Sequence, residues 1–400
     1  MQQSPDLAVV RYGEAGIKSD KVRGQMLDRL AENVRAILDD RGLPGAVERR
    51  WSRLLIRPPV TAADAFDADA AARAAADAFG VVSTRPAVST APTADALAEA
   101  AVELAADHPD GATFAVRANR AGTPETHPFT SQEVAGEVGA AIGDATGAGV
   151  DLDDPDRTYR LDVREDEAFV SAAEYDGPGG LPVGTQGKTV ALFSGGIDSP
   201  VAAWELFKRG LEVVPVYLDL GEYGGPDHLA RAIETAGTVA RSAPHVDARL
   251  RVVPAGELVD ELVAATGPTR MLSLRRAMLR VAEAVAADVG AHSIATGESI
   301  GQKSSQTGPN VRVTDAAATL PVHRPLLTRD KPEIVAQARE IGTFVDATMN
   351  VGCERVAPDY PETNATIEGV EAAEPDDLLD RAAALAEERY VVGEDGPNGE

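Results

Sequence analysis

The chain has 400 residues, of which 44% are hydrophobic and 26% charged. This composition is typical of a protein with folded cores, and at roughly 150 residues per domain the length predicts two or three domains. No apolar run reaches the ~18 residues of a transmembrane helix, and the N-terminus lacks the pattern of a signal peptide. The single cysteine excludes an internal disulfide and any metal site built on several thiolates. We therefore expect a cytoplasmic protein without membrane contact.

The net charge of −26 is strongly negative, and only six of the 38 basic residues are lysines. Such a surface keeps a protein soluble in concentrated salt, where charge repulsion is screened within about 3 Å at 1 M. The composition favours a halophilic source over the alternative of a merely acidic protein. Residues 1–60 are an exception, because they carry a net charge of +3. This local excess suggests contact with a polyanion.

The first 84 residues are predicted to form a β-α-β-β-α-β-like unit, the order of a ferredoxin-like domain. Apolar alternation indicates strands, apolar residues at helical spacing indicate helices, and Pro58-Pro59 ends the second strand. The expected elements are a strand over 7–13, a helix over 21–40, a strand over 47–57, a helix over 63–78 and a strand near 81–83.

Residues 85–175 are expected to form a second α+β domain. A Gly/Pro-rich stretch over 176–188 follows it and is the clearest linker in the chain. The expected elements are a helix over 93–107, a strand over 113–118, a helix over 131–144 with Ser131 as its N-cap, and strands over 158–164 and 167–172.

From residue 189 the pattern changes to strands alternating with helices, which predicts a doubly wound α/β domain with a parallel sheet. A helix is expected near the end, over 376–389, and the last ten residues form an acidic tail that frays. The expected strands lie over 189–193, 212–220, 250–255 and 292–296, and the expected helices over 199–209, 227–242 and 269–289.

The motif Ser194-Gly195-Gly196-Ile197-Asp198-Ser199 follows the first of these strands and opens a helix. The glycines let backbone amides approach a phosphate, and a helix N-terminus adds partial positive charge and free N–H donors. The spacing is neither GxxxxGK[ST] nor GxGxxG. It matches SGGxDS, the pyrophosphate loop of enzymes that split ATP between its α and β phosphates. A tight turn without a ligand is the alternative interpretation.

Three stretches resemble the tRNA 4-thiouridine synthetases, the ThiI or tRNA sulfurtransferase family: ALFSGGIDSPVAAWELFKRG, RRAMLRVAEAVAADVGAHSIATGESIGQKSSQT and HRPLLTRDKPEIVAQAREIGTF. The expected domain order also resembles this family, in which a ferredoxin-like domain is followed by a THUMP RNA-binding domain. The resemblance implies a ferredoxin-like domain over 1–84, a THUMP domain over 85–175, a linker over 176–188, a PP-loop ATP pyrophosphatase domain over 189–390 and an acidic tail over 391–400.

The resemblance further implies an enzyme that uses ATP and Mg²⁺ to adenylate uridine 8 of tRNA and to replace its O4 with sulfur. Some relatives also transfer sulfur to a carrier protein of thiazole and thiamine synthesis. Asp198 would then serve catalysis or hold magnesium. The residues implied in ATP binding are Leu192, Phe193, Ser194, Gly195, Gly196, Ser199, Tyr217, Leu218, Arg275, Gly297 and Gln306.

Cys353 lies in a polar loop with Gly352 before it and Arg355 after it, a setting that favours a thiolate. Thiouridine synthetases place a sulfur-handling cysteine at the corresponding position, whereas an inert small side chain is the alternative. Many bacterial members add a rhodanese domain with a second cysteine, and none follows here before Glu400, as in archaeal members. We therefore expect an external persulfide, sulfide or sulfur-carrier donor.

Basic side chains in an acidic chain are the natural candidates for RNA contact. Those expected to contact tRNA, or else to cover the outer face of a strand, are Arg49, Arg50, Arg53, Arg57, Arg117 and Arg120.

Two other functions stay open at this point. An amidotransferase of the same ATP fold would need no RNA-binding module and no thiol. An RNA-binding protein with an inactive loop would release no pyrophosphate. The sequence does not predict the oligomeric state, with which a homodimer is compatible.

Overall fold

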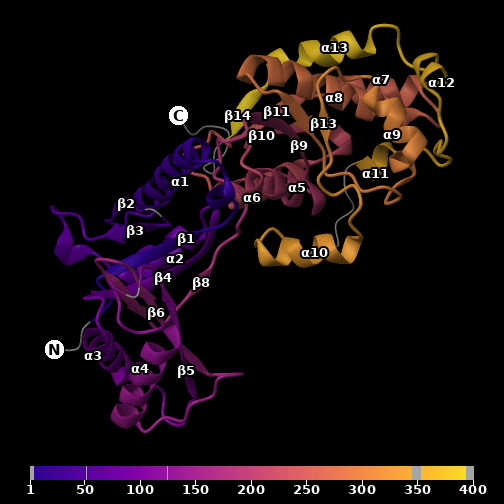
Figure 1. Ribbon diagram of the computed structural model, residues 1–400. Coiled ribbons are helices and arrows are strands. Elements are labelled where there is room, and N and C mark those ends of the chain that lie inside the picture. Colours follow the sequence, from indigo (N-terminus) through magenta and orange to yellow (C-terminus); the bar gives the residue numbers. More distant parts are fainter. Residues whose placement is uncertain (1–3, 51, 124, 345–352, 393–400) are drawn as a thin grey trace. The chain divides into compact units, whose positions relative to one another are not determined.

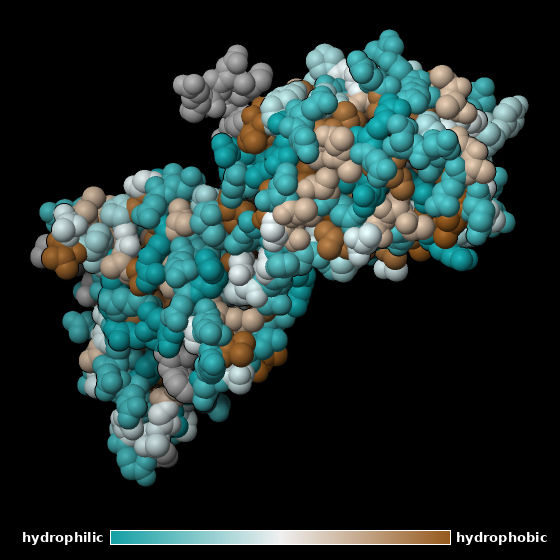
Figure 2. Space-filling view, turned by 90° about the horizontal axis from the view of Figure 1, so that it is seen from above, coloured by the Kyte–Doolittle hydropathy of each residue, from teal (hydrophilic) through white to brown (hydrophobic). Residues whose placement is uncertain are grey.

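The computed structural model describes residues 4–50, 52–123, 125–344 and 353–392, which fall into two compact units, 1–182 and 183–400. The boundary between these units lies within the predicted linker. No helix in the described part of the chain is long and apolar enough to cross a membrane. The face seen in Figure 2 is largely hydrophilic, with hydrophobic residues scattered over it.

The N-terminal unit is built on one continuous sheet of order β2-β3-β1-β4-β7-β6-β5, with β8 paired to β4 (Figure 1). Its strands are β1 Leu7–Tyr12, β2 Ala46–Arg50, β3 Arg53–Arg57, β4 Val81–Thr90, β5 Phe114–Arg120, β6 Arg157–Val163, β7 Ala168–Ser171 and β8 Tyr175–Asp176. Its helices are α1 Asp20–Asp40, α2 Ala68–Ala76, α3 Ala94–Leu104 and α4 Ser131–Thr146.

Strand β4 is longer than predicted and serves both halves of this sheet. It pairs with β1 along one edge and with β8 and then β7 along the other. Strand β4 therefore runs through residue 84, the predicted boundary between the first two domains. Because β4 belongs to both halves, the ferredoxin-like and THUMP parts share a backbone hydrogen-bond network.

Two local predictions were wrong. The expected single strand over 47–57 is a hairpin, in which Arg50 pairs with Arg53 around a two-residue turn. This turn contains no glycine, proline or asparagine, so nothing in the sequence marked it. Helix α4 begins at Ser131, but its N-cap is Thr130, which forms a capping box with Glu133.

The two faces of the sheet are covered differently. One face packs against α1 and α2, through residues such as Val10 and Leu54, and against α3 and α4, through residues such as Val88 and Leu161. Alternate residues on the other face form a small separate cluster. The members of this cluster are Leu7, Val9, Leu55, Ala87 and Phe169.

A buried ion pair closes this second face. Arg53 on β3 meets Asp162 on β6, although β1, β4 and β7 lie between these strands in the sheet. A flat sheet would hold the two strands roughly 19 Å apart, so the sheet must curl strongly to bring them together. Arg53 is only 4% exposed. Burial lowers the pKa of its guanidinium, and the Asp162 carboxylate opposes that change.

We expect Asp162→Ala to lower the free energy of unfolding by about 3–5 kcal/mol, because it leaves a buried guanidinium without its partner. Urea denaturation at constant salt measures the change. The control is Glu48→Ala, which removes an exposed ion pair with Arg50 and a longer one, at 3.6 Å, with Arg57, and should cost no more than about 1 kcal/mol. Equal, small losses in both variants would contradict a role for the buried pair in holding the curl.

The C-terminal unit is a six-stranded α/β sheet of order β13-β12-β9-β10-β11-β14. Its strands are β9 Lys188–Phe193, β10 Glu212–Asp219, β11 Leu250–Pro254, β12 Ser293–Ala295, β13 Val322–His323 and β14 Tyr390–Val392. Its helices are α5 Asp198–Lys208, α6 Pro226–Ala240, α7 Gly256–Ala265, α8 Arg270–Val289, α9 Gly308–Asp315, α10 Lys331–Glu340, α11 Cys353–Val356, α12 Ile367–Glu371 and α13 Leu378–Leu385.

This unit confirms the predicted doubly wound fold. Strands β9 to β13 are parallel, and helices cover both faces, with α7, α8 and α13 on one side and α5 and α6 on the other (Figure 1). The chain runs outward from β9 to β11 and then returns to β12 on the other side of β9. The strand order thus reverses beside β9, and such a reversal opens a ligand crevice at the carboxyl ends of the strands.

The C-terminal end differs from the expectation. The helix predicted over 376–389 is the shorter α13, and the chain then forms β14, antiparallel to β11. Val391 and Val392, the first two residues of the predicted tail, belong to this strand. The other residues of that tail lie outside the described part of the chain.

Candidate nucleotide site at the end of β9

The pyrophosphate-type loop connects β9 to α5 at the point where the strand order reverses. Ser199 accepts a hydrogen bond from the Ser194 amide at 2.9 Å and donates one to the Ser194 carbonyl at 3.0 Å. The Gly196 amide donates to Ser194 Oγ at 3.2 Å. Among the described residues no side chain caps the start of α5, so its first N–H groups are available to an anion.

Two glycines let neighbouring segments press against this loop. A Cβ on Gly195 would lie 2.7 Å from the carbonyl oxygen of His228 in the first turn of α6. A Cβ on Gly297, just after β12, would lie 2.9 Å from the carbonyl carbon of Asp198 and 3.0 Å from the amide of Ser199. The close neighbour of Gly297 is thus the loop itself, and the predicted role of Gly297 in ATP binding stays a prediction.

Asp198 is held by two side chains that the sequence did not suggest. Lys331 Nζ, at the start of α10, lies 2.6 Å from Oδ1, and Gln302 Nε2 donates to Oδ2 at 3.0 Å. A lysine in the first turn of a helix opposes the helix dipole, and this chain has few lysines. That unfavourable position was the available signal that Lys331 serves a site.

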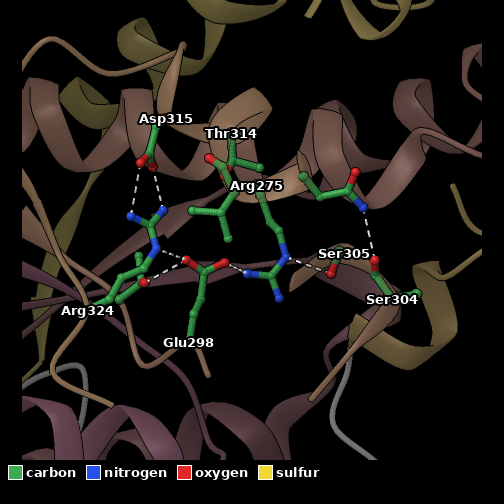
Figure 3. Close-up of polar contacts among 10 residues, drawn as sticks. Arg275, Glu298, Ser304, Ser305, Thr314, Asp315 and Arg324 are labelled. Atoms are coloured by element: carbon green, nitrogen blue, oxygen red, sulfur yellow. Dashed lines mark hydrogen bonds and ion pairs between the residues drawn. The ribbon is translucent and has the colours of Figure 1, made fainter. Parts of the chain in front are cut away.

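Arg275 is fixed by the chain of polar contacts shown in Figure 3. Its Nε donates to Ser305 Oγ at 3.0 Å, and its Nη1 bonds to the buried carboxylate of Glu298. Glu298 also accepts from Arg324 at 2.6 Å, and Arg324 reaches on to Asp315. Burial raises the pKa of Glu298, but the two guanidiniums outweigh it and hold that pKa below its usual value. Glu298 therefore remains an anion that orients both arginines.

The remaining residues implied in ATP binding lie around the loop. Leu192 and Leu218 are buried in the core beneath α8, whereas Phe193 pairs with Tyr217 across the neighbouring strand ends. These four side chains are buried, so at the strand ends mainly backbone atoms are accessible to a nucleotide. Gln306 is buried, and its Oε1 has no partner among the described residues.

The predicted RNA-contacting arginines do not form one patch. Arg49 bonds to Asp28 of α1, whereas Arg50 and Arg57 lie on the opposite face of the hairpin, beside Glu48 and Glu167. Arg53 is buried and paired with Asp162, so its guanidinium is not accessible to RNA. Arg117 is exposed and Arg120 is half-buried, and both donate to backbone carbonyls of their own domain.

Cys353 is the first residue of α11, and its side chain lies outside the described part of the structure. Arg355, two residues on, is exposed and donates to the Glu222 carbonyl at 3.5 Å. Glu222 belongs to the short turn Gly221–Tyr223 that follows β10. Helix α11 is therefore anchored at the carboxyl edge of the sheet, the edge that carries the pyrophosphate-type loop.

Three family models match successive parts of the chain. The ThiI ferredoxin-like domain matches residues 7–84, the THUMP domain residues 91–173, and the thiamine biosynthesis protein (ThiI) model residues 184–378. Together with the loop at the reversal point, these matches define a PP-loop enzyme fold joined to an RNA-binding type of module.

Relatives named "Probable tRNA sulfurtransferase" match over nearly the whole chain. One from Halobacterium salinarum is 54% identical over 95% of this chain and 96% of its own length. One from Thermus thermophilus is 38% identical over 96% of this chain and 93% of its own length. The chain therefore belongs to the tRNA sulfurtransferase family, which confirms the resemblance seen in its motifs. The Halobacterium relative also agrees with the salt-adapted composition.

Solved structures give the same fold. A crystal structure of a 4-thiouridine synthetase in complex with RNA and bound ATP has a TM-score of 0.81 and 28% identity, covering 96% of this chain and 98% of that one. PH1313 from Pyrococcus horikoshii shares the fold, with a TM-score of 0.65 and 22% identity. The match covers 84% of this chain and 99% of PH1313.

We expect Gly297→Ala to weaken ATP binding at least tenfold, because its Cβ would press on the backbone of Asp198 and Ser199, which cannot rotate away as a side chain can. Isothermal titration with ATP measures the affinity. Gly308→Ala is the matched control, since a Cβ there meets nothing within 4 Å. ATP affinity that is equal in both variants would show that the close packing does not shape the site.

Proposed function

We propose that this protein is an ATP-dependent tRNA sulfurtransferase that activates uridine 8 of tRNA and exchanges its O4 for sulfur. The observation that carries the proposal is an uncapped helix N-terminus at the strand reversal, with Asp198, Lys331 and Gln302 gathered beside it. Family membership supplies tRNA as the substrate, and the related synthetase with bound RNA and ATP supports both ligands.

In this proposal the loop and Arg275 hold the phosphates of ATP. The amide of Gly195 and the dipole of α5 face the negative charge, and Glu298 keeps Arg275 in place. The uracil O4 attacks the α phosphorus, the bond to the bridging oxygen breaks, and pyrophosphate departs with the electron pair. The phosphates of bound ATP would compete with the Asp198 carboxylate for the ammonium group of Lys331. Lys331 would then stabilise the negative charge that develops on the departing pyrophosphate.

The residues present suit a magnesium ion bound mainly through phosphates. Asp198 offers one carboxylate, and the described residues contain no group of three or more metal-ligating side chains. Mg²⁺ usually keeps several waters and uses one or two carboxylates together with substrate phosphates. Bound there, the ion would supply charge neutralisation for pyrophosphate.

The sulfur step is proposed to involve Cys353 and an external donor. A donor persulfide transfers its outer sulfur to Cys353, and this sulfur attacks C4 and expels AMP, leaving the base joined to Cys353 through a disulfide. With one cysteine in the chain, an external thiol must attack Cys353 Sγ to release 4-thiouridine. A second external thiol then reduces the mixed disulfide. An enzyme that modifies tRNA and depends on external thiols is proposed to work in the cytoplasm.

We expect the purified protein to form 4-thiouridine in unmodified tRNA with ATP and sulfide, and to release one pyrophosphate for each base modified. Nucleoside mass spectrometry and a pyrophosphate assay measure both. Asp198→Ala should abolish both products, whereas Glu340→Ala, an exposed acid at the far end of α10, should not. If the wild-type protein formed no 4-thiouridine, the proposed function would be wrong.

Cys353→Ser should retain tRNA binding and ATP-dependent pyrophosphate release but lose thiolation from a persulfide donor. The reason is that serine can take no sulfur. Intact-mass spectrometry of the wild-type protein during turnover should find an adduct of about 32 Da, one sulfur atom, at Cys353. Full activity of the serine variant with every donor would leave Cys353 without a covalent role.

A further inference from the structure

We propose that a pocket beside α11 receives the target uracil of the RNA; this inference rests on the proposed function. The pocket has a volume of about 320 Å³ and lies between the start of α8 and the segment that follows α11. Its lining residues are Gly267, Pro268, Arg270, Ala357, Pro358, Asp359 and Tyr360.

Arg270 brings unused hydrogen-bond donors to this pocket. Its guanidinium donates to three backbone carbonyls, at 3.2 Å to Thr266, 3.0 Å to Val263 and 3.2 Å to Val356. A guanidinium has five N–H groups, so two of them have no acceptor among the described residues. No ion pair in the described part of the chain involves Arg270, whereas Arg275 and Arg276 on the same helix are both paired with glutamates. A partly buried cation without a carboxylate is expected to meet acceptor atoms of a ligand.

The other wall of the pocket suits a flat, neutral ring. Tyr360 is 85% exposed and stands beside Pro358, and Asp359 offers a carboxylate acceptor nearby. Bases drawn out of an RNA stack are bound by stacking on aromatic rings and by hydrogen bonds to their edges. Uracil presents two carbonyl acceptors, which suit Arg270, and one ring N–H, which suits Asp359. Cytosine has no N–H at that ring position and would place an acceptor against the carboxylate.

The pocket also lies close to the reacting groups. Arg270 holds the carbonyl of Val356, the last residue of the four-residue helix that begins at Cys353. A helix of that length spans about 6 Å. The opposite side is tied to the nucleotide site, because Asn310 donates both to the Ser304 carbonyl, beside Gln306, and to the Glu362 carbonyl, beyond Tyr360. The pocket thus adjoins the cysteine-bearing helix, and Asn310 links the segment that follows Tyr360 to the loop that carries Gln306.

Variants at Tyr360 test the inference without disturbing the core, because this side chain is exposed. We expect Tyr360→Ala to lower kcat/KM for thiolation of tRNA about tenfold or more, the loss expected for one stacked base. Tyr360→Phe should keep the wild-type value, since it retains the ring. Tyr390→Ala removes another exposed tyrosine of the same unit and serves as the control. ATP affinity should be the same in all four proteins.

Photo-cross-linking locates the base independently of catalysis. Synthetic tRNA with 4-thiouridine at position 8 is bound to the full-length protein and irradiated, and the cross-linked peptide is identified by mass spectrometry. We expect the cross-link within residues 357–360, and its yield should fall in Tyr360→Ala.

Three results would overturn the inference. The first is a cross-link confined to other segments, and the second is an unchanged kcat/KM for Tyr360→Ala. The third is a loss of thiolation by Tyr360→Ala with a protein persulfide donor but not with sodium sulfide. This third result would make the pocket a docking site for the donor. Each differs from failure of the proposed function, in which the wild-type protein forms no 4-thiouridine at all.

Discussion

The carboxylate of Asp198 occupies a position where phosphates are expected, and the arrangement of the C-terminal unit follows from that conflict. An anion beside a phosphate-binding loop needs a cation or a hydrogen-bond donor, and here Lys331 and Gln302 supply one each. Lys331 lies 133 positions away in sequence, after β13, and Gln302 lies 104 positions away, after β12. Helix α10 and the loop before α9 are therefore fixed to the start of α5, which gathers the site at one edge of the sheet.

A second constraint acts beside the first. Glu298 is buried between Arg275 and Arg324, and it stays ionised because both guanidiniums face it. A buried carboxylate that pairs with two guanidiniums holds both of them in place, because moving either one away would leave a buried charge without its partner. The position of Arg275 is thus set by the core of the unit before any nucleotide arrives, and such preorganisation is what phosphate chemistry requires.

The sequence predicted what depends on neighbouring residues and missed what depends on distant ones. The strand–loop–helix around Ser194–Ser199 was predictable because glycines, serines and the apolar strand are contiguous. Lys331 and Gln302 were missed because their role exists only after the sheet has formed. Arg53 was assigned to the surface because it is charged, and only the curl of the sheet brings Asp162 to it. The hairpin at residues 50–53 was missed because its turn lacks glycine and proline.

The shared strand β4 has a consequence for how the N-terminal unit opens and closes. Regions that exchange backbone hydrogens together are those whose hydrogen bonds must break together. Strand β4 is paired by β1 of the ferredoxin-like half along one edge and by β7 and β8 along the other, so the backbone hydrogen bonds of the two halves meet on one strand. The ferredoxin-like and THUMP parts are thus distinct as sequence families but are built into one sheet. We therefore expect a change that loosens β4 to lower the protection of backbone amides in both parts.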